Sequence, residues 1–113
     1  PNWLFGPVWT ILYILMGISL YLVWNKKGQN NNRKLATIAF IIQLLLNVMW
    51  SLVFFALESP FLALLVIVLL WLAISITIYL FYAISRWSSY LLIPYLMWVS
   101  FAIILNISIV VLN

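Results

Sequence analysis

The sequence predicts an all-α membrane protein, an up-and-down bundle of transmembrane helices, and three observations lead to that prediction. Hydrophobic residues make up 69% of the chain and charged residues only 5%, a composition that no water-soluble domain of this size sustains on its surface. The apolar residues form four blocks, each long enough to cross a membrane. Short polar segments separate the blocks, so consecutive helices are antiparallel neighbours. We therefore expect residues 1–113 to form a single transmembrane domain.

The predicted helices cover about residues 3–24, 35–56, 61–84 and 90–112. At a rise of about 1.5 Å per residue, each spans roughly 30 Å or slightly more, which matches a hydrocarbon core. Pro60 fits the first turn of the third helix, whereas Pro94 either bends the last helix or marks its true start. The chain begins without a methionine or a basic signal-peptide segment, so we expect it to be part of a longer protein.

Charged residues lie only in the segments between the blocks. The cations occupy the first and last of these segments, and they are Lys26, Lys27, Arg33, Lys34 and Arg86. The positive-inside rule therefore predicts that residues 25–34 and 85–89 are cytoplasmic, in a protein that we place in the cell membrane. Contact of these cations with anionic lipid head groups or with ligand carboxylates is the alternative. Nucleic-acid binding is not expected, because the cations form no continuous stripe.

The composition excludes several chemistries. The sequence has no cysteine and no histidine, and Glu58 is its single acidic residue. A zinc site, a histidine-based triad and a pair of catalytic carboxylates are therefore impossible within these residues, and we expect no metal and no cofactor. A small drug/proton exporter would fit the number of helices. However, it needs an ionisable group inside the membrane, and Glu58 lies in a predicted turn.

The tryptophans fall into two groups. Those at the block ends, together with Tyr90, are typical of an aromatic belt at the lipid head groups, and they are Trp3, Trp24 and Trp87. Those deep within the blocks are Trp9, Trp50, Trp71 and Trp98. A deep indole N–H needs a partner inside the protein, so the second group supplies the candidates for a site, although Trp71 could equally serve packing or a dimer contact.

Helical spacing places the deep tryptophans on faces that also carry small residues and amides. The three faces are Trp9, Tyr13, Gly17 and Tyr21; Gln43, Asn47, Trp50 and Phe54; and Trp98, Ala102 and Asn106. We expect these faces to turn inward, because amides avoid lipid. The amides could simply link the helices, with Gly17 and Ala102 allowing close approach. Several inward indoles would instead hold the helices apart unless a flat guest fills the space.

Several ordered motifs carry a family resemblance. Residues 3–13 read WLFGPVWTILY, residues 43–51 read QLLLNVMWS, and residues 92–102 read LIPYLMWVSFA. Ser59-Pro60 precedes a Leu-Leu-Trp at residues 69–71, and Leu105-Asn106 follows the last motif. Together these segments, which cover essentially the whole chain, resemble helices two to five of the TspO family of tryptophan-rich sensory and translocator proteins.

The resemblance implies a five-helix bundle whose first helix is missing here, and homodimers. It implies that the protein binds porphyrin or a related flat tetrapyrrole, as a sensor, receptor or carrier. The family's pocket positions fall on Trp9, Tyr13, Asn47, Trp50, Trp98 and Ala102. Trp9 and Trp98 match a pair implicated in light-dependent porphyrin breakdown, so a porphyrin-degrading enzyme is the alternative. Residues 103–111 contain neither tyrosine nor cation, which argues against the family's sterol-recognition motif.

Overall fold

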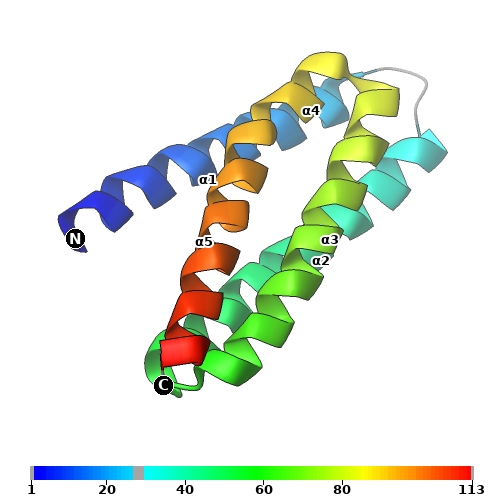
Figure 1. Ribbon diagram of the computed structural model, residues 1–113. Coiled ribbons are helices and arrows are strands. Elements are labelled where there is room, and N and C mark those ends of the chain that lie inside the picture. The colour runs from blue at the N-terminus through cyan, green and yellow to red at the C-terminus, as the bar shows by residue number, and fades with distance from the viewer. Residues whose placement is uncertain (1, 27–29, 113) are drawn as a thin grey trace.

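The computed structural model describes residues 2–26 and 30–112, which are helical almost throughout (Figure 1). The helices are α1 (Asn2–Asn25), α2 (Asn30–Ser51), the π-helix η1 (Leu52–Ala56), α3 (Pro60–Ile84), α4 (Arg86–Leu91) and α5 (Ile93–Leu112). Within the described residues, four stretches are long and apolar enough to cross a membrane, and they are Gly6–Asn25, Asn32–Ala56, Pro60–Ile84 and Arg86–Leu112. The predicted fold class, an all-α bundle of membrane-spanning helices, is confirmed.

The connection between α1 and α2 is shorter than the sequence pattern suggested. We expected the polar run up to Lys34 to be loop, but α2 begins at Asn30. The Arg33 side chain reaches back and donates a hydrogen bond to the Lys26 carbonyl. Its guanidinium also lies 5.1 Å from the ring centroid of Trp24, within cation–π range. These contacts tie the first turns of α2 to the end of α1, so a polar sequence that would otherwise be loop is helical.

The last membrane-spanning stretch consists of two helices rather than one. Ser85 is extended, with φ −150° and ψ 116°, and the following residues form α4, where we expected a loop. A tight turn then separates α4 from α5, with the Leu92 N–H donating to the Ser89 carbonyl at 3.1 Å. Pro94 is the second residue of α5, a position where its missing N–H has no intrahelical partner to lose. Pro94 thus marks the start of a helix.

The turn between η1 and α3 lies at the opposite end of the bundle from Ser85. The Leu57 N–H donates to the Leu52 carbonyl at 3.0 Å, and the Ser59 N–H donates to the Val53 carbonyl at 3.2 Å. Glu58 adopts a φ of 50°, the left-handed conformation that commonly ends a helix. Its side chain is exposed. The only acidic group of the chain is therefore outside the helical spans.

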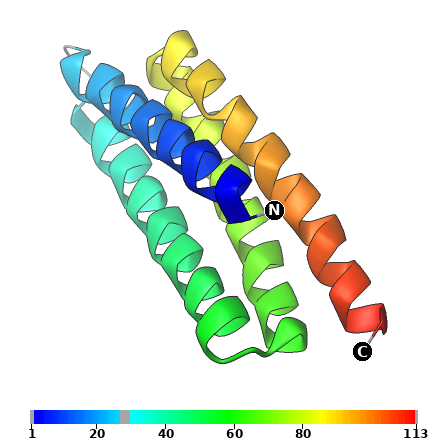
Figure 2. The same ribbon diagram turned by 90° about the vertical axis from the view of Figure 1, so that its left-hand side faces the viewer.

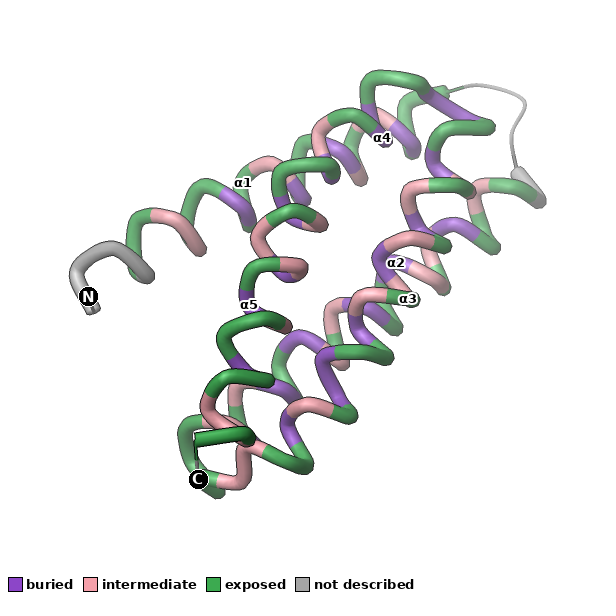
Figure 3. Tube along the Cα trace, in the orientation of Figure 1, coloured by how far each residue is buried: buried purple, intermediate pink, exposed green. Residues whose placement is uncertain are grey.

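The helices are arranged unevenly around a core that runs along α3. In both views α2 and α3 lie side by side, and α5 returns along α3 (Figures 1 and 2). The helix α1 packs by its C-terminal half near α4, while its N-terminal end stands away from the other helices. Figure 3 shows buried positions on the facing sides and exposed ones on the outside. The exposed residues are largely Ile, Leu, Val and aromatic, as expected for a surface solvated by lipid.

The inward face of α1 differs from the predicted one in its second half. The buried residues of α1 are Leu12, Met16, Ser19 and Val23, whereas Gly17 and Tyr21 are exposed. A Cβ atom added to Gly17 would meet nothing within 4 Å, so this glycine does not serve close approach. The helix is apolar on all sides, and periodicity alone therefore cannot select which stripe faces the protein.

Candidate functional site

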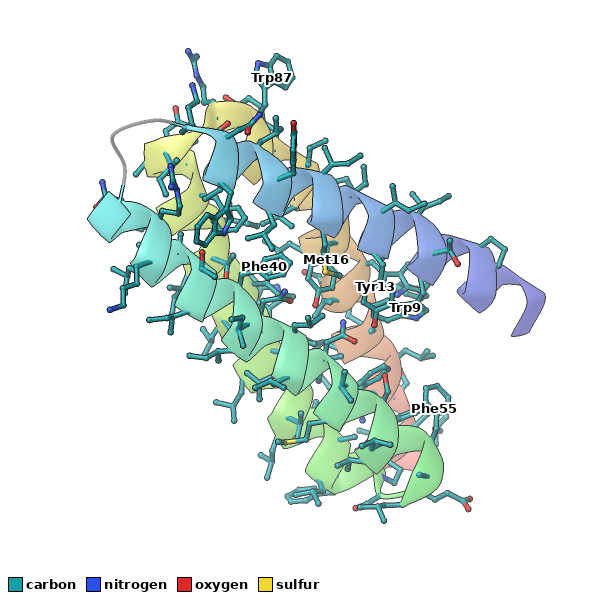
Figure 4. All side chains as sticks on the ribbon, turned by 180° about the vertical axis from the view of Figure 1, so that it is seen from behind. Trp9, Tyr13, Met16, Phe40, Phe55 and Trp87 are labelled. Carbon is teal, nitrogen blue, oxygen red and sulfur yellow. The ribbon has the colours of Figure 1, made fainter. Side chains whose placement is uncertain are left out.

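A cavity of about 420 Å³ lies between α1, the end of α2 with η1, and α5. Its lining residues are Trp9, Tyr13, Trp50, Ser51, Phe54, Phe55, Trp98, Phe101, Ala102, Leu105 and Ile109. Figure 4 shows Trp9 and Tyr13 together on α1, with Phe55 further along the bundle at η1. Three of the four deep tryptophans therefore line one apolar cavity.

The aromatic rings of the wall pack against one another, both edge-to-face and stacked. The Trp9 ring lies 6.4 Å from the Trp98 ring at an interplanar angle of 88°. Trp50 stacks on Phe54 at 5.1 Å and 23°, and Phe55 stands edge-on to Phe54 at 4.9 Å and 78°. Edge-to-face packing of this kind is favourable for aromatic pairs.

Two consecutive phenylalanines of η1 reach the same cavity. Successive residues of a regular α-helix point about 100° apart, and the wider turn of a π-helix makes this angle only somewhat smaller. Phe54 and Phe55 both line the cavity, with their ring centroids 4.9 Å apart in an edge-to-face contact. Helical spacing in the sequence places only Phe54 of these two on the inward face of its helix. The five further lining residues that the sequence did not single out for this wall are Ser51, Phe55, Phe101, Leu105 and Ile109, of which Phe101 and Leu105 follow Trp98 at helical spacing.

A chain of hydrogen bonds lies behind the cavity wall and joins three helices. The Tyr13 hydroxyl donates to Asn47 Oδ1 at 2.8 Å, and Asn47 Nδ2 donates to the Tyr95 hydroxyl at 2.9 Å. The Tyr95 hydroxyl in turn donates to Gln43 Oε1 at 2.7 Å, and Gln43 Nε2 lies 3.9 Å from Met16 Sδ. Tyr95 is fully buried, and Asn47 and Gln43 are each 1% exposed.

This network changes the expected place of Asn47. We predicted that its amide lines the pocket, but Asn47 is absent from the lining, and both ends of its side chain are bonded within the protein. The interpretation that Asn47 and Gln43 link helix to helix therefore describes their contacts. Five of the six predicted site residues do line the cavity, and they are Trp9, Tyr13, Trp50, Trp98 and Ala102.

Two indole N–H groups are used to join helices. Trp50 Nε1 donates to Asn106 Oδ1 at 3.1 Å, and Asn106 Nδ2 donates to the Pro60 carbonyl at 2.8 Å. Asn106 is fully buried. Trp71 Nε1 donates to Ser100 Oγ at 2.9 Å, which connects α3 to α5. Trp50 is thus a fixed part of the wall, and Trp71 serves packing between helices.

The expected belt residues lie at the end of the bundle where α1 and α3 finish. Trp24 is 52% exposed and Trp87 71% exposed, and Tyr90 lies 5.7 Å from the Trp87 ring. The side chain of Trp3 lies outside the described residues. Among the described residues, no group of three or more His, Cys, Asp or Glu could hold a metal ion.

Comparison with known proteins identifies the family. The sequence model of the TspO/MBR family matches residues 1–112. The chain belongs to the TspO/MBR family. It is similar to the tryptophan-rich protein TspO of Chlorobaculum tepidum, with 48% identity over 113 residues, which cover the whole chain and 72% of that relative. A protein of the same name from Archaeoglobus fulgidus gives the same identity and coverage.

More distant members of the TspO/MBR family carry names that describe a role. The tryptophan-rich sensory protein of Cereibacter sphaeroides is 33% identical over 113 residues, which cover the whole chain and 69% of that relative. The human translocator protein is 36% identical over 107 residues, which cover 94% of the chain and 63% of that relative. The family resemblance carried by the sequence motifs is confirmed, and with it the assignment of the chain to a family of sensory and translocator proteins of the membrane.

Proposed function

We propose that this protein binds a porphyrin or a related flat tetrapyrrole in the tryptophan-lined cavity, and that it acts as a sensor, receptor or carrier of that ligand. One observation carries the proposal, namely the apolar cavity of about 420 Å³ walled by aromatic rings from α1, η1 and α5. The volume lies within the roughly 300–1,000 Å³ of typical ligand sites. The names of these relatives, sensory protein and translocator protein, fit a membrane protein that holds a ligand.

The geometry of the wall supports a planar guest. Because the Trp9 and Trp98 rings are nearly perpendicular, a macrocycle that stacks on one meets the edge of the other, and both contacts are favourable for π-systems. Ala102, which also lines the cavity, contributes only a methyl group. A polar ligand would find few partners, since the Tyr13 hydroxyl donates to Asn47 and the Ser51 hydroxyl donates to the Asn47 carbonyl at 3.3 Å.

Titration with protoporphyrin, followed by its visible absorbance, tests the proposal. Replacing Trp9 or Trp98 by leucine removes an aromatic face worth about 1 kcal/mol, so each change should raise Kd about fivefold. The matched control is Trp87→Leu, because Trp87 is exposed outside the cavity, and it should leave Kd unchanged. Saturable binding with the same Kd in all three variants would refute stacking in this cavity.

Porphyrin degradation under light is a second candidate function, favoured by the two oxidisable indoles 6.4 Å apart in one wall. Dioxygen is the oxidant in this reaction and the excited macrocycle is oxidised, so no acid or base is required. Irradiation of the porphyrin complex in air should give product, with none in the dark or under argon. If the variant carrying both Trp9→Phe and Trp98→Phe forms product at the same rate per bound porphyrin, the tryptophans have no part in the reaction.

We further propose that the basic end of the bundle faces the cytoplasm, as the positive-inside rule predicts. The chain has no native cysteine, so single cysteines can be introduced and labelled in intact cells. A membrane-impermeant maleimide should label Glu58→Cys and leave Lys34→Cys unlabelled. The reverse pattern would overturn the orientation.

A further inference from the structure

The basic end of the bundle carries positive charge that the protein does not neutralise. The described cations are Lys26, Arg33, Lys34 and Arg86, and all lie where α1 ends, α2 begins and α4 begins. The only acidic side chain, Glu58, lies at the other end of α3, a helix of 25 residues that is about 37 Å long at 1.5 Å per residue. At that distance it is far beyond ion-pair range, so the counter-charge has to come from outside the chain.

A cleft of about 350 Å³ lies at this end, separate from the tryptophan-lined cavity. Its lining residues are Lys26, Tyr82, Ile84, Ser85, Arg86 and Trp87. The two cations reach it from different elements, Lys26 from the end of α1 and Arg86 from the first residue of α4. Trp87 is 71% exposed and Tyr82 53% exposed at its rim. Two cations lining one polar cleft form a suitable site for a phosphate group.

Contacts between helices fix the backbone near the cleft. The Ser19 hydroxyl of α1 donates to the Ser88 carbonyl of α4 at 2.6 Å, and both residues are fully buried. The Arg33 side chain fixes the carbonyl of Lys26. On the other side, the Ser85 N–H donates to the Phe81 carbonyl at 2.7 Å and sets the direction in which α4 leaves α3. The backbone positions of Lys26 and Arg86 are therefore fixed by the bundle.

We propose that this cleft binds the phosphate of an anionic phospholipid of the membrane, with Lys26 and Arg86 contacting its oxygens and Trp87 and Tyr82 lying at the level of the glycerol. The exposed aromatic rings favour lipid over a soluble phosphate, because tryptophan and tyrosine concentrate at the head-group level. Figure 4 shows Trp87 at the far end of the bundle from Phe55. The lipid site is thus independent of the proposed tetrapyrrole site.

Lipid retention measured on the full chain tests the proposal. The protein is reconstituted into phosphatidylcholine vesicles that contain increasing fractions of phosphatidylglycerol, and bound lipid is counted by native mass spectrometry. A direct hydrogen bond from a charged side chain to a phosphate oxygen contributes at least about a fivefold increase in affinity. Lys26→Gln and Arg86→Gln should each weaken phosphatidylglycerol retention about fivefold, whereas Arg86→Lys, which keeps the charge, should retain most of it.

The matched control is Lys34→Gln, which removes the same charge from the same end of the bundle but outside the cleft. It should change retention less than about twofold. An equal loss in Lys34→Gln and Arg86→Gln would show diffuse attraction by the basic end and would overturn a discrete site. Millimolar inorganic phosphate and the deacylated head group glycerophosphoglycerol should fail to displace the lipid. If they displace it, and Arg86→Gln prevents their binding, the cleft takes a soluble phosphate and the lipid proposal is wrong.

Discussion

Asn106 offers a sharp test of how the cavity wall is held. It is fully buried and joins three elements, because it accepts from the Trp50 indole at 3.1 Å and donates to the Pro60 carbonyl at 2.8 Å. Asn106→Leu keeps the approximate size of the side chain and removes both bonds. It leaves the Trp50 N–H without its partner in a region from which water is excluded.

The size of the effect follows from these two contacts. Hydrogen bonds between membrane helices contribute about 0.6 kcal/mol on average and at most about 1.7 kcal/mol. Losing both should therefore lower the free energy of unfolding by about 1–3 kcal/mol. Part of that loss comes from the hydrogen bond between Trp50 and Asn106 alone. A double-mutant cycle with Trp50→Phe isolates this part, since phenylalanine keeps an aromatic ring and lacks the N–H.

Equilibrium unfolding in mixed micelles of mild detergent and dodecyl sulfate, followed by circular dichroism, gives the four free energies of the cycle. The coupling energy between Trp50 and Asn106 should be about 0.6–1.7 kcal/mol. The expected sign is that Asn106→Leu costs less in the Trp50→Phe background than in the wild type. If Asn106→Leu costs the same in both backgrounds within about 0.3 kcal/mol, the hydrogen bond does not hold the indole, and the account of Trp50 as a fixed wall fails.

Three further predictions concern the network and the cavity. Tyr95→Phe should lower the free energy of unfolding by about 1–3 kcal/mol, because the Tyr95 hydroxyl joins two buried amides. Tyr13→Phe should lower it by less than about 1 kcal/mol, because the Tyr13 hydroxyl joins one amide from a partly exposed position. Equal costs in the same unfolding assay would contradict this. Ala102→Phe should fill the cavity and weaken porphyrin binding more than about tenfold at unchanged helicity, and an unchanged Kd would place the ligand elsewhere. Metal-free and metal-bearing porphyrins of the same periphery should bind within about threefold of each other, since the described cavity lining has no His, Cys or Met and its Tyr13 hydroxyl is bonded to Asn47. A tenfold preference for the metal form would refute this.

The sequence predicts the long apolar helices well because hydropathy is a local property. A run of apolar residues can be recognised without knowing its tertiary contacts, so composition and length alone predict the four apolar stretches. The same holds for Trp9, Trp50 and Trp98, whose depth within a span is set by counting residues. Their convergence on one cavity follows from antiparallel packing of short-linked helices.

The rotation of α1 about its own axis and the hydrogen-bond partners of the buried amides could not be predicted from local sequence patterns. Every stripe of α1 is apolar, so the choice of Leu12 and Met16 over Gly17 for the buried face depends on how α1 crosses the bundle. The Asn47 side chain is hydrogen-bonded to tyrosines from two other helices. Residue spacing within one helix carries no information about such contacts between helices. The π-helix at Leu52–Ala56 likewise leaves no periodic signal, because it changes the period itself.

The polar side chains behind the cavity wall are hydrogen-bonded to one another, and this limits how the protein can recognise a ligand. Inside a bilayer an unpaired amide or hydroxyl is costly, and Asn47 and Tyr95 satisfy each other and their neighbours without a ligand. The proposed ligand would consequently meet rings and methyl groups, and its recognition would depend on shape. An apolar pocket separates ligands that differ by one methylene by only about 1–3 kcal/mol, whereas a site built to hydrogen-bond its ligand rejects analogues that lack the polar group by factors of about 10⁴–10⁵. Selectivity among flat macrocycles is therefore expected to be low and set by the dimensions of the cavity. Small residues of the cavity wall such as Ala102 should control this selectivity more strongly than any polar side chain of the hydrogen-bond network.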